Sequence, residues 1–445
     1  ETDSAEETDD LESADMQTES EAAAEAAVQT ETADAAETDG ETADAAVTQV
    51  TTEAELTAAL AAASTDAENP TVIELQNDIS CTAYLNIASG TYVEIRSAEG
   101  QQYTLLATGA AADYRNGRYV SGLLYVGGSL VLENVICDAN QIDRCAYVPA
   151  GATLELGNGA VLTNGKPTYA SRQVYNDGGG AYVLGTLIMD KGSAVRNNTV
   201  DLSTRGSLPN GIGVYIGNDA EFIMYGGAIS GNSYVYDTCG VQGGGVYLGN
   251  YASFYMYGGT IADNEISGRG AGVFTEGYCT VVLGKTDDTE IPDGVQCDEK
   301  AVIRDNVIYD DITSSNYKPQ GAGVYLAAGS DMTIQASDDE NTVISGNTVY
   351  TSCYEMPETV GSGIPQPADR GCGGGLFVLG DVTMTGGSIT ENRAVGTEAP
   401  GENEEDPDQY HYASGAGVYL QTGSFTMTGG QISGNTASAA WTDNT

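Results

Sequence analysis

The sequence predicts an all-β protein, a right-handed parallel β-helix of about 9–11 coils with a short N-terminal capping helix and a disordered acidic tail. The first observation is an internal repeat: GAGVYLQTGSFTMTGGQISGN at 415–435 is repeated with small changes at 211–232, 243–264 and 373–392. Weaker copies begin at Leu123, Ala146, Gly178, Gly270 and Gly321, so nine copies cover about 121–435. A fixed unit repeated along a chain is typical of a solenoid.

The second observation is the alternation within each copy. In the last copy it predicts three short strands, at 418–420, 425–428 and 431–433, separated by Gly-Gly and Gly-Asn steps that favour tight turns. Alternate residues point inward, namely Val418, Leu420, Phe425, Met427 and Ile432. Three strands per coil, each paired with its counterpart in the next coil, give a rod of roughly 45–55 Å. A coil cannot bury its own inner face, so stability comes from stacking.

The third observation is a pair of columns that run through all nine copies. The aromatic column is Tyr125, Tyr147, Tyr182, Tyr215, Tyr247, Phe274, Tyr325, Phe377 and Tyr419. The asparagine column is Asn140, Asn164, Asn198, Asn232, Asn264, Asn306, Asn347, Asn392 and Asn435. Asparagine tolerates the left-handed conformation, and its amide can bond the amide of the next coil. We therefore expect the asparagines to form a structural ladder.

The aromatic column leaves three interpretations open. Its neighbours on both sides are aliphatic, so the aliphatic residues point inward and the rings point outward. The rings could stabilise neighbouring strands by stacking, offer a platform for sugars, or lie beneath folded-back loops.

The N-terminal part differs from the repeat. Residues 1–47 contain 17 Asp and Glu residues and no Lys or Arg, so we expect 1–48 to be a disordered acidic tail, either a spacer or a solubilising leader. The segment 53–64 is rich in strong helix formers, and 49–70 is expected to be a capping helix and linker. The β-helix then covers 71–445. The chain begins with Glu1 and stops inside a repeat-like pattern, and we expect it to be a piece of a longer protein, truncated at its C-terminus.

Composition restricts the function. The 445 residues include 64 Asp and Glu against 16 Lys and Arg, a formal net charge of −48. This excess disfavours binding to nucleic acid or to anionic membranes, which both require clustered basic residues. No apolar run approaches the roughly 18–20 residues of a membrane span.

The insertions between repeats predict the binding site. All long insertions lie between the column asparagine and the next glycine, at 199–210, 233–242, 307–320, 348–372 and 393–414, so they leave the rod at one edge. Their tyrosines are Tyr234, Tyr236, Tyr309, Tyr317, Tyr350, Tyr354, Tyr410 and Tyr412. Loops rich in Tyr, Ser, Gly and Asn on a rigid scaffold are typical of binding loops. The alternative is that these tyrosines pack on the aromatic column and hold the loops down.

The eight cysteines predict two disulfides and no metal site. Cys137 aligns with inward Ile432 and is expected to be buried. Cys353 and Cys372 bracket one loop, Cys279 and Cys297 bracket another, and disulfides at these pairs would suit a secreted protein. No C-x-x-C pair supports zinc, and no acidic run has the spacing of a calcium loop, so no cofactor is expected beyond weakly bound calcium.

These patterns resemble the pectate-lyase-like β-helix superfamily, particularly Gly-rich surface proteins of Gram-positive bacteria. They are also similar to polymorphic outer-membrane adhesins, whose repeats pair Gly-Gly-Ala-aliphatic with Phe-x-x-Asn. The equivalents here are GGGV at 243–246 and ISGN at 432–435, with small residues in place of Ala and Ile in place of Phe. The resemblance covers about 71–435 and implies a secreted or surface-displayed, adhesin-like protein.

Enzymes with this fold offer a second expectation, a polysaccharide lyase or hydrolase. The hydrolases use a Gly-His-Gly step and an Arg-x-Lys motif, whereas this chain has one histidine, His411, with no glycine beside it, and no Arg-x-Lys. The nearest candidates for a catalytic base are Arg196 and Arg304, with the carboxylates Asp305 and Glu391 close by in the sequence. A surface charge pair is the favoured interpretation of these residues.

The main functional expectation is therefore a non-enzymatic, adhesin-like β-helix, monomeric and located on the surface of, or secreted by, a Gram-positive bacterium. It would bind a host surface protein or a glycan through the Tyr-rich loops and would not insert into a membrane. The alternatives are a carbohydrate-active enzyme and a plain stalk segment.

Overall fold

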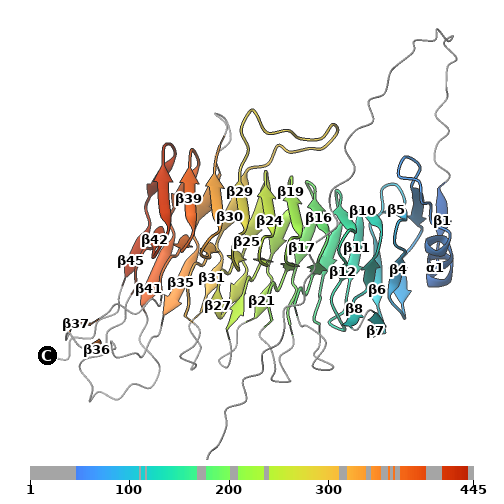
Figure 1. Ribbon diagram of the computed structural model, residues 1–445. Helices are drawn as coiled ribbons and strands as arrows, with labels where there is room; N and C mark the ends of the chain where they lie inside the picture. Colours follow the sequence, from blue (N-terminus) through green and yellow to red (C-terminus); the bar gives the residue numbers. More distant parts are fainter. Residues whose placement is uncertain are drawn as a thin grey trace, which may run out of the picture. The chain divides into compact units, whose positions relative to one another are not determined.

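The computed structural model shows the predicted right-handed parallel β-helix (Figure 1). The structure describes residues 47–109, 112–115, 118–167, 177–200, 209–234, 240–309, 318–336, 342–351, 359–360, 364–365, 371–396 and 413–438. The chain divides into two compact units, Glu1–Asp44 and Ala45–Thr445, and every described residue belongs to the second. Of the expected disordered tail, residues 1–46 lie outside the described residues, whereas Thr48 begins β1 (Thr48–Val50), which pairs with β2 (Thr71–Leu75).

Three long parallel sheets form the walls, and each coil contributes one strand to each of them in the order C, A, B. Sheet A consists of β1 (Thr48–Val50), β2 (Thr71–Leu75), β5 (Tyr92–Ser97), β10 (Ser129–Glu133), β13 (Thr153–Leu156), β16 (Thr186–Met189), β19 (Glu221–Met224), β24 (Ser253–Met256), β29 (Thr280–Leu283), β33 (Asp331–Ile334), β39 (Asp381–Met384) and β43 (Ser424–Met427). Sheet B consists of β3 (Ile79–Cys81), β6 (Tyr103–Ala107), β11 (Val135–Asp138), β14 (Val161–Thr163), β17 (Ala194–Arg196), β20 (Ala228–Ser230), β25 (Gly259–Ala262), β30 (Ala301–Arg304), β34 (Val343–Ser345), β40 (Ser388–Thr390) and β44 (Gln431–Ser433). Sheet C consists of β4 (Leu85–Ile87), β9 (Leu124–Val126), β12 (Ala146–Val148), β15 (Ala181–Val183), β18 (Val214–Ile216), β23 (Val246–Leu248), β28 (Val273–Thr275), β32 (Val324–Leu326), β38 (Leu376–Val378) and β42 (Val418–Leu420).

A fourth parallel sheet, D, corrects the prediction of three strands per coil. It consists of β21 (Ser233–Tyr234), β26 (Glu265–Ile266), β31 (Val307–Ile308), β35 (Thr348–Thr351), β41 (Arg393–Gly396) and β45 (Thr436–Ser438). Each strand begins directly after a column asparagine, inside a segment that the sequence assigned to an insertion or to a turn. These strands contain two to four residues and share no sequence, so alternation could not reveal them.

Three small pairs complete the secondary structure. The parallel pair is β22 (Val241–Gln242) with β27 (Gly268–Arg269), and the antiparallel pairs are β7 (Ala112–Arg115) with β8 (Arg118–Ser121) and β36 (Thr359–Val360) with β37 (Ile364–Pro365).

The core is built from columns of similar side chains, because the strands pair in register from coil to coil. On sheet A, Leu187 pairs with Phe222 and Phe222 with Phe254, and the two Phe rings stack at 4.8 Å between centroids. On sheet B, Cys137 is buried and pairs with Leu162 in the column that ends at Ile432, which confirms its predicted inward position. Burying apolar side chains in this way stabilises a fold by about 25 cal/mol per Å² of apolar surface.

The predicted helix forms at the N-terminal end of the stack as α1 (Glu53–Ala61). Thr52 and Glu55 make a capping box, in which the Thr52 side chain accepts the Glu55 N–H and the Glu55 side chain accepts the Thr52 N–H. Leu56 and Leu60 are buried, and the helix contacts β1, β3 and β4. It covers the first coil, as a capping helix should. The described part of the chain has no helix with the length and hydropathy needed to cross a bilayer.

The last coil has no such cover among the described residues. Its inward side chains Leu420, Met427 and Ile432 are 46, 41 and 41 % exposed, whereas the equivalent residues of earlier coils are buried. This contrast shows how much of each coil's burial comes from the next coil.

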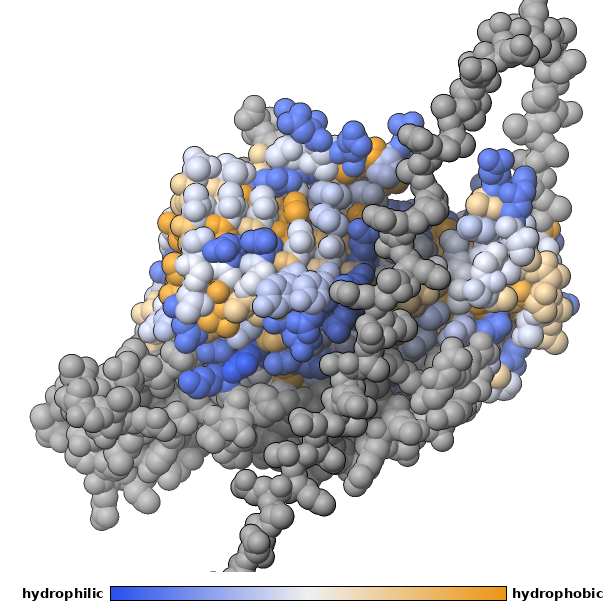
Figure 2. Space-filling model, viewed as in Figure 1, coloured by the Kyte–Doolittle hydropathy of each residue, from blue (hydrophilic) through white to orange (hydrophobic). Residues whose placement is uncertain are grey.

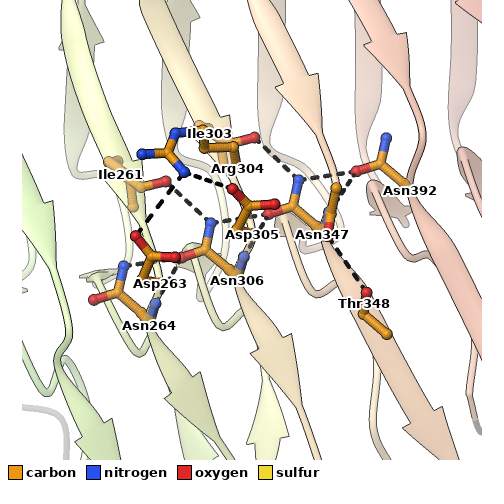
Figure 3. A network of polar contacts seen from close by, with 11 residues as sticks. Ile261, Asp263, Asn264, Ile303, Arg304, Asp305, Asn306, Asn347, Thr348 and Asn392 are labelled. Carbon is orange, nitrogen blue, oxygen red and sulfur yellow. Dashed lines mark hydrogen bonds and ion pairs between the residues drawn. The ribbon is translucent and has the colours of Figure 1, made fainter.

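The predicted asparagine ladder runs along the turn that follows sheet B (Figure 3). Asn306 shows the pattern: its Oδ1 accepts the backbone N–H of Asn264 at 3.2 Å and the Asn264 Nδ2 at 2.9 Å, and its own Nδ2 donates to Ile261 O at 3.0 Å and to Asn347 Oδ1 at 2.9 Å. The ladder residues are Asn198, Asn232, Asn264, Asn306, Asn347, Asn392 and Asn435. The ladder continues the backbone pairing with side-chain amides where the chain turns.

Two details of the asparagine prediction were wrong. The ladder asparagines do not adopt the left-handed conformation; the residue before each does, for example Asn197, Asp263 and Glu391, with φ of 57°, 55° and 58°. Asn140 and Asn164, with φ of 51° and 57°, are not part of the ladder. In the coil of Asn164 the ladder position is Gly165, whose N–H donates to Asn198 Oδ1 at 2.8 Å.

Replacing Asn306 by Ala tests the ladder. The substitution removes the partner of the buried Asn264 amide groups and of Ile261 O, and an unpaired buried polar group costs about 1–3 kcal/mol, so we expect a loss of about 2–5 kcal/mol. The urea midpoint of unfolding measures it. Asn69→Ala, which removes one exposed bond to Asp66, is the control and should change stability by less than about 0.5 kcal/mol. Equal effects of the two variants would contradict a special role of the ladder.

Candidate binding surface

The insertions leave the solenoid at one edge, between sheets D and C, and the structure fixes them at both ends. At the start, strands of sheet D pair with each other directly after the ladder. At the end, the residues before the repeat glycines pair from coil to coil through Asn210, Gln242, Arg269, Gln320, Cys372 and Ser414. The bases of successive insertions are therefore held one coil apart, which orders this edge as a surface.

Tyr234, one of the predicted binding residues, is a packing residue instead. It is buried in the inward row of sheet D, whose members in later coils are Ile266, Ile308, Val349 and Ala394. These side chains form a small second core with Val241, Ala271 and Ala322 at the insertion edge. The prediction failed here because residues 233–234 belong to a strand and not to a loop.

Tyr309 and Tyr350 lie on the outward side of the same sheet. They occupy equivalent positions in successive coils, each one residue beyond the inward row, and both are partly buried. Their rings stack at 5.6 Å with an interplanar angle of 6°. The other predicted binding residues, Tyr236, Tyr317, Tyr354, Tyr410 and Tyr412, lie outside the described residues.

The aromatic column forms a continuous stack of nine rings on the outward side of sheet C, from Tyr125 to Tyr419. Successive centroids are 4.5–5.8 Å apart, with interplanar angles of 4–15°. Such stacked pairs stabilise a fold by about 0.5–1.5 kcal/mol each beyond their burial.

Most of this column is covered, which decides among the three interpretations. Tyr147, Tyr182, Tyr247, Phe274, Tyr325 and Phe377 are buried. The Arg269 guanidinium carbon lies 5.5 Å from the Tyr325 centroid, and Cys372 packs in the same cluster. Both residues belong to the row at the ends of the insertions. The buried rings therefore give stacking stabilisation under cover and do not provide an open platform for sugars. Burial also raises the pKa of the Tyr182, Tyr247 and Tyr325 hydroxyls, which stay protonated at neutral pH.

Sheet A carries a carboxylate cluster that the sequence analysis missed. Glu133, Glu155 and Asp190 lie on its outward side in successive coils, and the Glu133 carboxylate occupies the space that a Cβ on Gly157 would need. Burial, then the charge of Asp190 and a hydrogen bond to it, raise the pKa of Glu155 to about 7. Burial also raises the pKa of Asp190 and of Glu133. Glu155 thus holds a proton that bonds Asp190 near neutral pH. The sequence signal for this cluster was Gly157, which lies between Glu133 and Asp190 when equivalent outward positions of successive coils are aligned.

Of the residues considered for catalysis, Arg304 and Asp305 form a surface ion pair. Arg304 Nη1 lies 2.5 Å from Asp305 Oδ2 and 4.0 Å from Asp263 Oδ2, and all three side chains are substantially exposed (Figure 3). Asp305 and Glu391 occupy the left-handed turn positions before the ladder. Arg196 is exposed at the end of β17. These positions match the favoured interpretation as surface charges.

The disulfide expected between Cys279 and Cys297 does not form. Cys279 is buried at the start of β29, its thiol donates to Gly249 O at 3.1 Å, and burial raises its pKa. The inward orientation of Cys279 keeps it from the surface insertion that contains Cys297. Cys353 lies outside the described residues, so the pair Cys353–Cys372 stays a prediction. Within the described ranges, no group of three or more His, Cys, Asp and Glu residues has the arrangement of a metal site.

Comparisons with known proteins give no relative: no protein-family model matches the chain, and neither a curated protein nor a solved structure is significantly similar to it.

The carboxylate cluster should make stability depend on pH. The folded pKa of Glu155, about 7, lies above the unfolded value, so the folded state binds more protons and loses stability as pH rises from about 4.5 to 7. Glu155→Gln keeps a donor for Asp190 at every pH. We expect the variant to be more stable than the wild type at pH 8 by about 1–2 kcal/mol, after allowance for partial exposure, and nearly equal at pH 4.5.

Urea unfolding at pH 4.5 and 8 measures this effect, and Glu265→Gln is the control. Glu265 is an exposed carboxylate on β26, so its substitution removes one negative charge without touching the cluster. The same gain at pH 8 in both variants would show that general charge repulsion is the cause.

Proposed function

We propose that this protein is a non-enzymatic, secreted or surface-displayed β-helix, adhesin-like, that binds a host surface protein or a glycan at the insertion edge. The observation that carries the proposal is the arrangement of this edge: each insertion base is anchored by a strand of sheet D and by the row before the glycines. A rigid scaffold that holds loops at fixed spacing is how many binding sites are built.

Tyr309 and Tyr350 are the described side chains that best fit binding at this edge. They point away from the small core beneath sheet D, and their parallel rings offer a large contact area with few rotatable bonds. The net charge of −48 favours a neutral or basic partner. The proposed location, secreted or on the cell surface, rests on the resemblance of the repeats to β-helix surface proteins of Gram-positive bacteria.

A second candidate function is polysaccharide hydrolysis, which one observation favours. Burial and the charge of Asp190 raise the pKa of Glu155 to about 7, and burial also raises the pKa of the neighbouring Asp190. A carboxyl whose pKa is raised by burial serves as the general acid in glycosidases. Release of reducing ends from neutral or acidic polysaccharides, above a heat-treated control and abolished in Asp190→Asn, would replace the proposal by this alternative.

The binding proposal predicts that the double variant Tyr309→Ser, Tyr350→Ser loses affinity. We expect the full-length chain to bind a component of a glycan array or of a panel of purified host cell-surface glycoproteins. The variant should bind it at least tenfold more weakly, about 1.4 kcal/mol or more, as loss of aromatic hot spots does. Its melting temperature should change by only a few degrees.

Tyr92→Ser is the matched control, since Tyr92 is a partly buried tyrosine on β5 of sheet A, remote from the edge. Sharp loss of melting temperature in the double variant without loss of binding would assign Tyr309 and Tyr350 to packing, as for Tyr234. Unchanged binding and melting would exclude this pair, and Tyr354→Ser, Tyr410→Ser, Tyr412→Ser would then test the remaining loop tyrosines.

A further inference from the structure

Tyr251 and Tyr278 form an exposed aromatic pair on the turn between sheets C and A, at the opposite end of the sheet C strands from the insertion edge. They are 60 and 61 % exposed. The other exposed large apolar side chains of the described residues are Val47, at the start of the described chain, and Leu420, Met427 and Ile432, in the uncovered last coil. Tyr251 and Tyr278 are therefore the described large apolar side chains that are exposed although a coil covers theirs on both sides.

The backbone makes the exception stronger. Tyr251 and Tyr278 have φ of 61° and 55°, in the left-handed region that disfavours bulky residues. In neighbouring coils the same turn position is occupied by Asp219 and by Gly329, both of which suit positive φ. Gly or Asn would adopt this conformation at a lower cost, so the backbone of the turn does not account for the tyrosines.

The two rings make one surface that spans two coils. Their centroids are 5.2 Å apart and their planes differ by 11°. Tyr278 leans over the next coil, with its ring carbons 2.8 Å from where a Cβ on Gly329 would stand, so the glycine makes room for the ring. Because the two rings stack on each other and are both mostly exposed, their outer atoms together form one exposed aromatic surface.

The groups around the pair indicate the chemistry of the ligand. Asn218 precedes Asp219 in the neighbouring turn, and Asn250 precedes Tyr251, so amide groups border the rings; Asn218 Oδ1 accepts the Asn250 N–H at 3.0 Å. Asp219 and Glu276 add exposed carboxylates, and Glu276 also accepts the Tyr247 hydroxyl at 2.9 Å. Residues 217–220, 249–252, 276–279 and 327–330 contain no Lys or Arg. Flat aromatic rings bordered by amides and carboxylates suit the apolar faces and the hydroxyls of a sugar, and the negative charges exclude acidic sugars and phosphates.

We propose that Tyr251 and Tyr278 are a binding platform for a neutral oligosaccharide, separate from the insertion edge. The exposed atoms of the stacked rings pack against the apolar face of a sugar, and the neighbouring amides and carboxylates bond sugar hydroxyls. The left-handed turn holds the rings out from the solenoid, and their stacking fixes them before the ligand arrives, which lowers the entropy lost on binding.

The test uses the full chain and affinity electrophoresis in gels that contain mixed-linkage glucan, galactomannan, xylan or polygalacturonate. We expect at least one neutral polysaccharide to retard the wild type and polygalacturonate not to retard it. The double variant Tyr251→Asn, Tyr278→Asn keeps residues that accept positive φ, so it should fold with unchanged or higher stability and bind the neutral polysaccharide at least tenfold more weakly. Tyr92→Ser, on β5 and outside both proposed binding surfaces, should be retarded as the wild type is, which ties the retardation to the Tyr251 and Tyr278 pair.

Four results would overturn the proposal. One is no retardation by any of the three neutral polysaccharides, and another is equal retardation of the wild type and the Asn variant. The third is a large drop in the melting temperature of the Asn variant, which would make the tyrosines packing groups. Binding of a Lys- and Arg-rich peptide in place of a polysaccharide, lost in the same variant, would also reject the sugar and assign the platform to a cationic polypeptide.

Discussion

The structure depends on exact translation of one coil onto the next, and the asparagine ladder is the interaction that enforces it. A buried turn cannot leave its amides without partners, and here each ladder side chain from Asn232 to Asn392 uses its oxygen twice and its nitrogen twice. A shift by one residue would remove these bonds and would place the inward columns outside. Because the ladder fixes the register at the corner, the adjoining sheets need only short strands of three or four residues in most coils.

The same constraint explains why insertions concentrate at one place. Sheets C, A and B are joined in most coils by tight turns with left-handed residues, where extra residues would disturb the stacking of the next turn. The segment 284–300, between β29 and β30, is a long exception. After the ladder, the strand of sheet D restores pairing, and the chain then leaves the stack and returns at the row before the repeat glycine. That row also shields the aromatic column, as Arg269 and Cys372 do over Tyr325 and Phe377. Anchoring of the insertions and burial of the rings are thus one structural feature.

How much the sequence could predict follows from which features repeat. The coils, the inward residues and the ladder from Asn198 onward recur at fixed places, and periodicity found them. The single helix α1 was predicted from its strong helix formers. Sheet D escaped because pairs such as Ser233–Tyr234 and Glu265–Ile266 have no common residue type, although their backbones pair. For that reason Tyr234 was assigned to binding when it is core. The shift from Asn164 to Gly165 was invisible, since only the hydrogen bonds show which residue occupies the ladder position. The disulfide between Cys279 and Cys297 was predicted because the two residues flank an insertion. Sequence spacing does not show the direction in which a thiol points.

In a solenoid of this kind, residues that depart from their column are the most informative about function. A column residue that matches its neighbours is explained by stacking, whereas a departure that costs stability requires another reason. Glu155, Asp190 and their raised pKa values are one such departure, and the tyrosines at positive φ in two successive turns are another. Both lie in the middle of the stack, where each coil is covered on both sides and where the fold has least need of them. Stacking supplies a uniform, rigid background, and binding or chemistry is to be sought where that uniformity is broken.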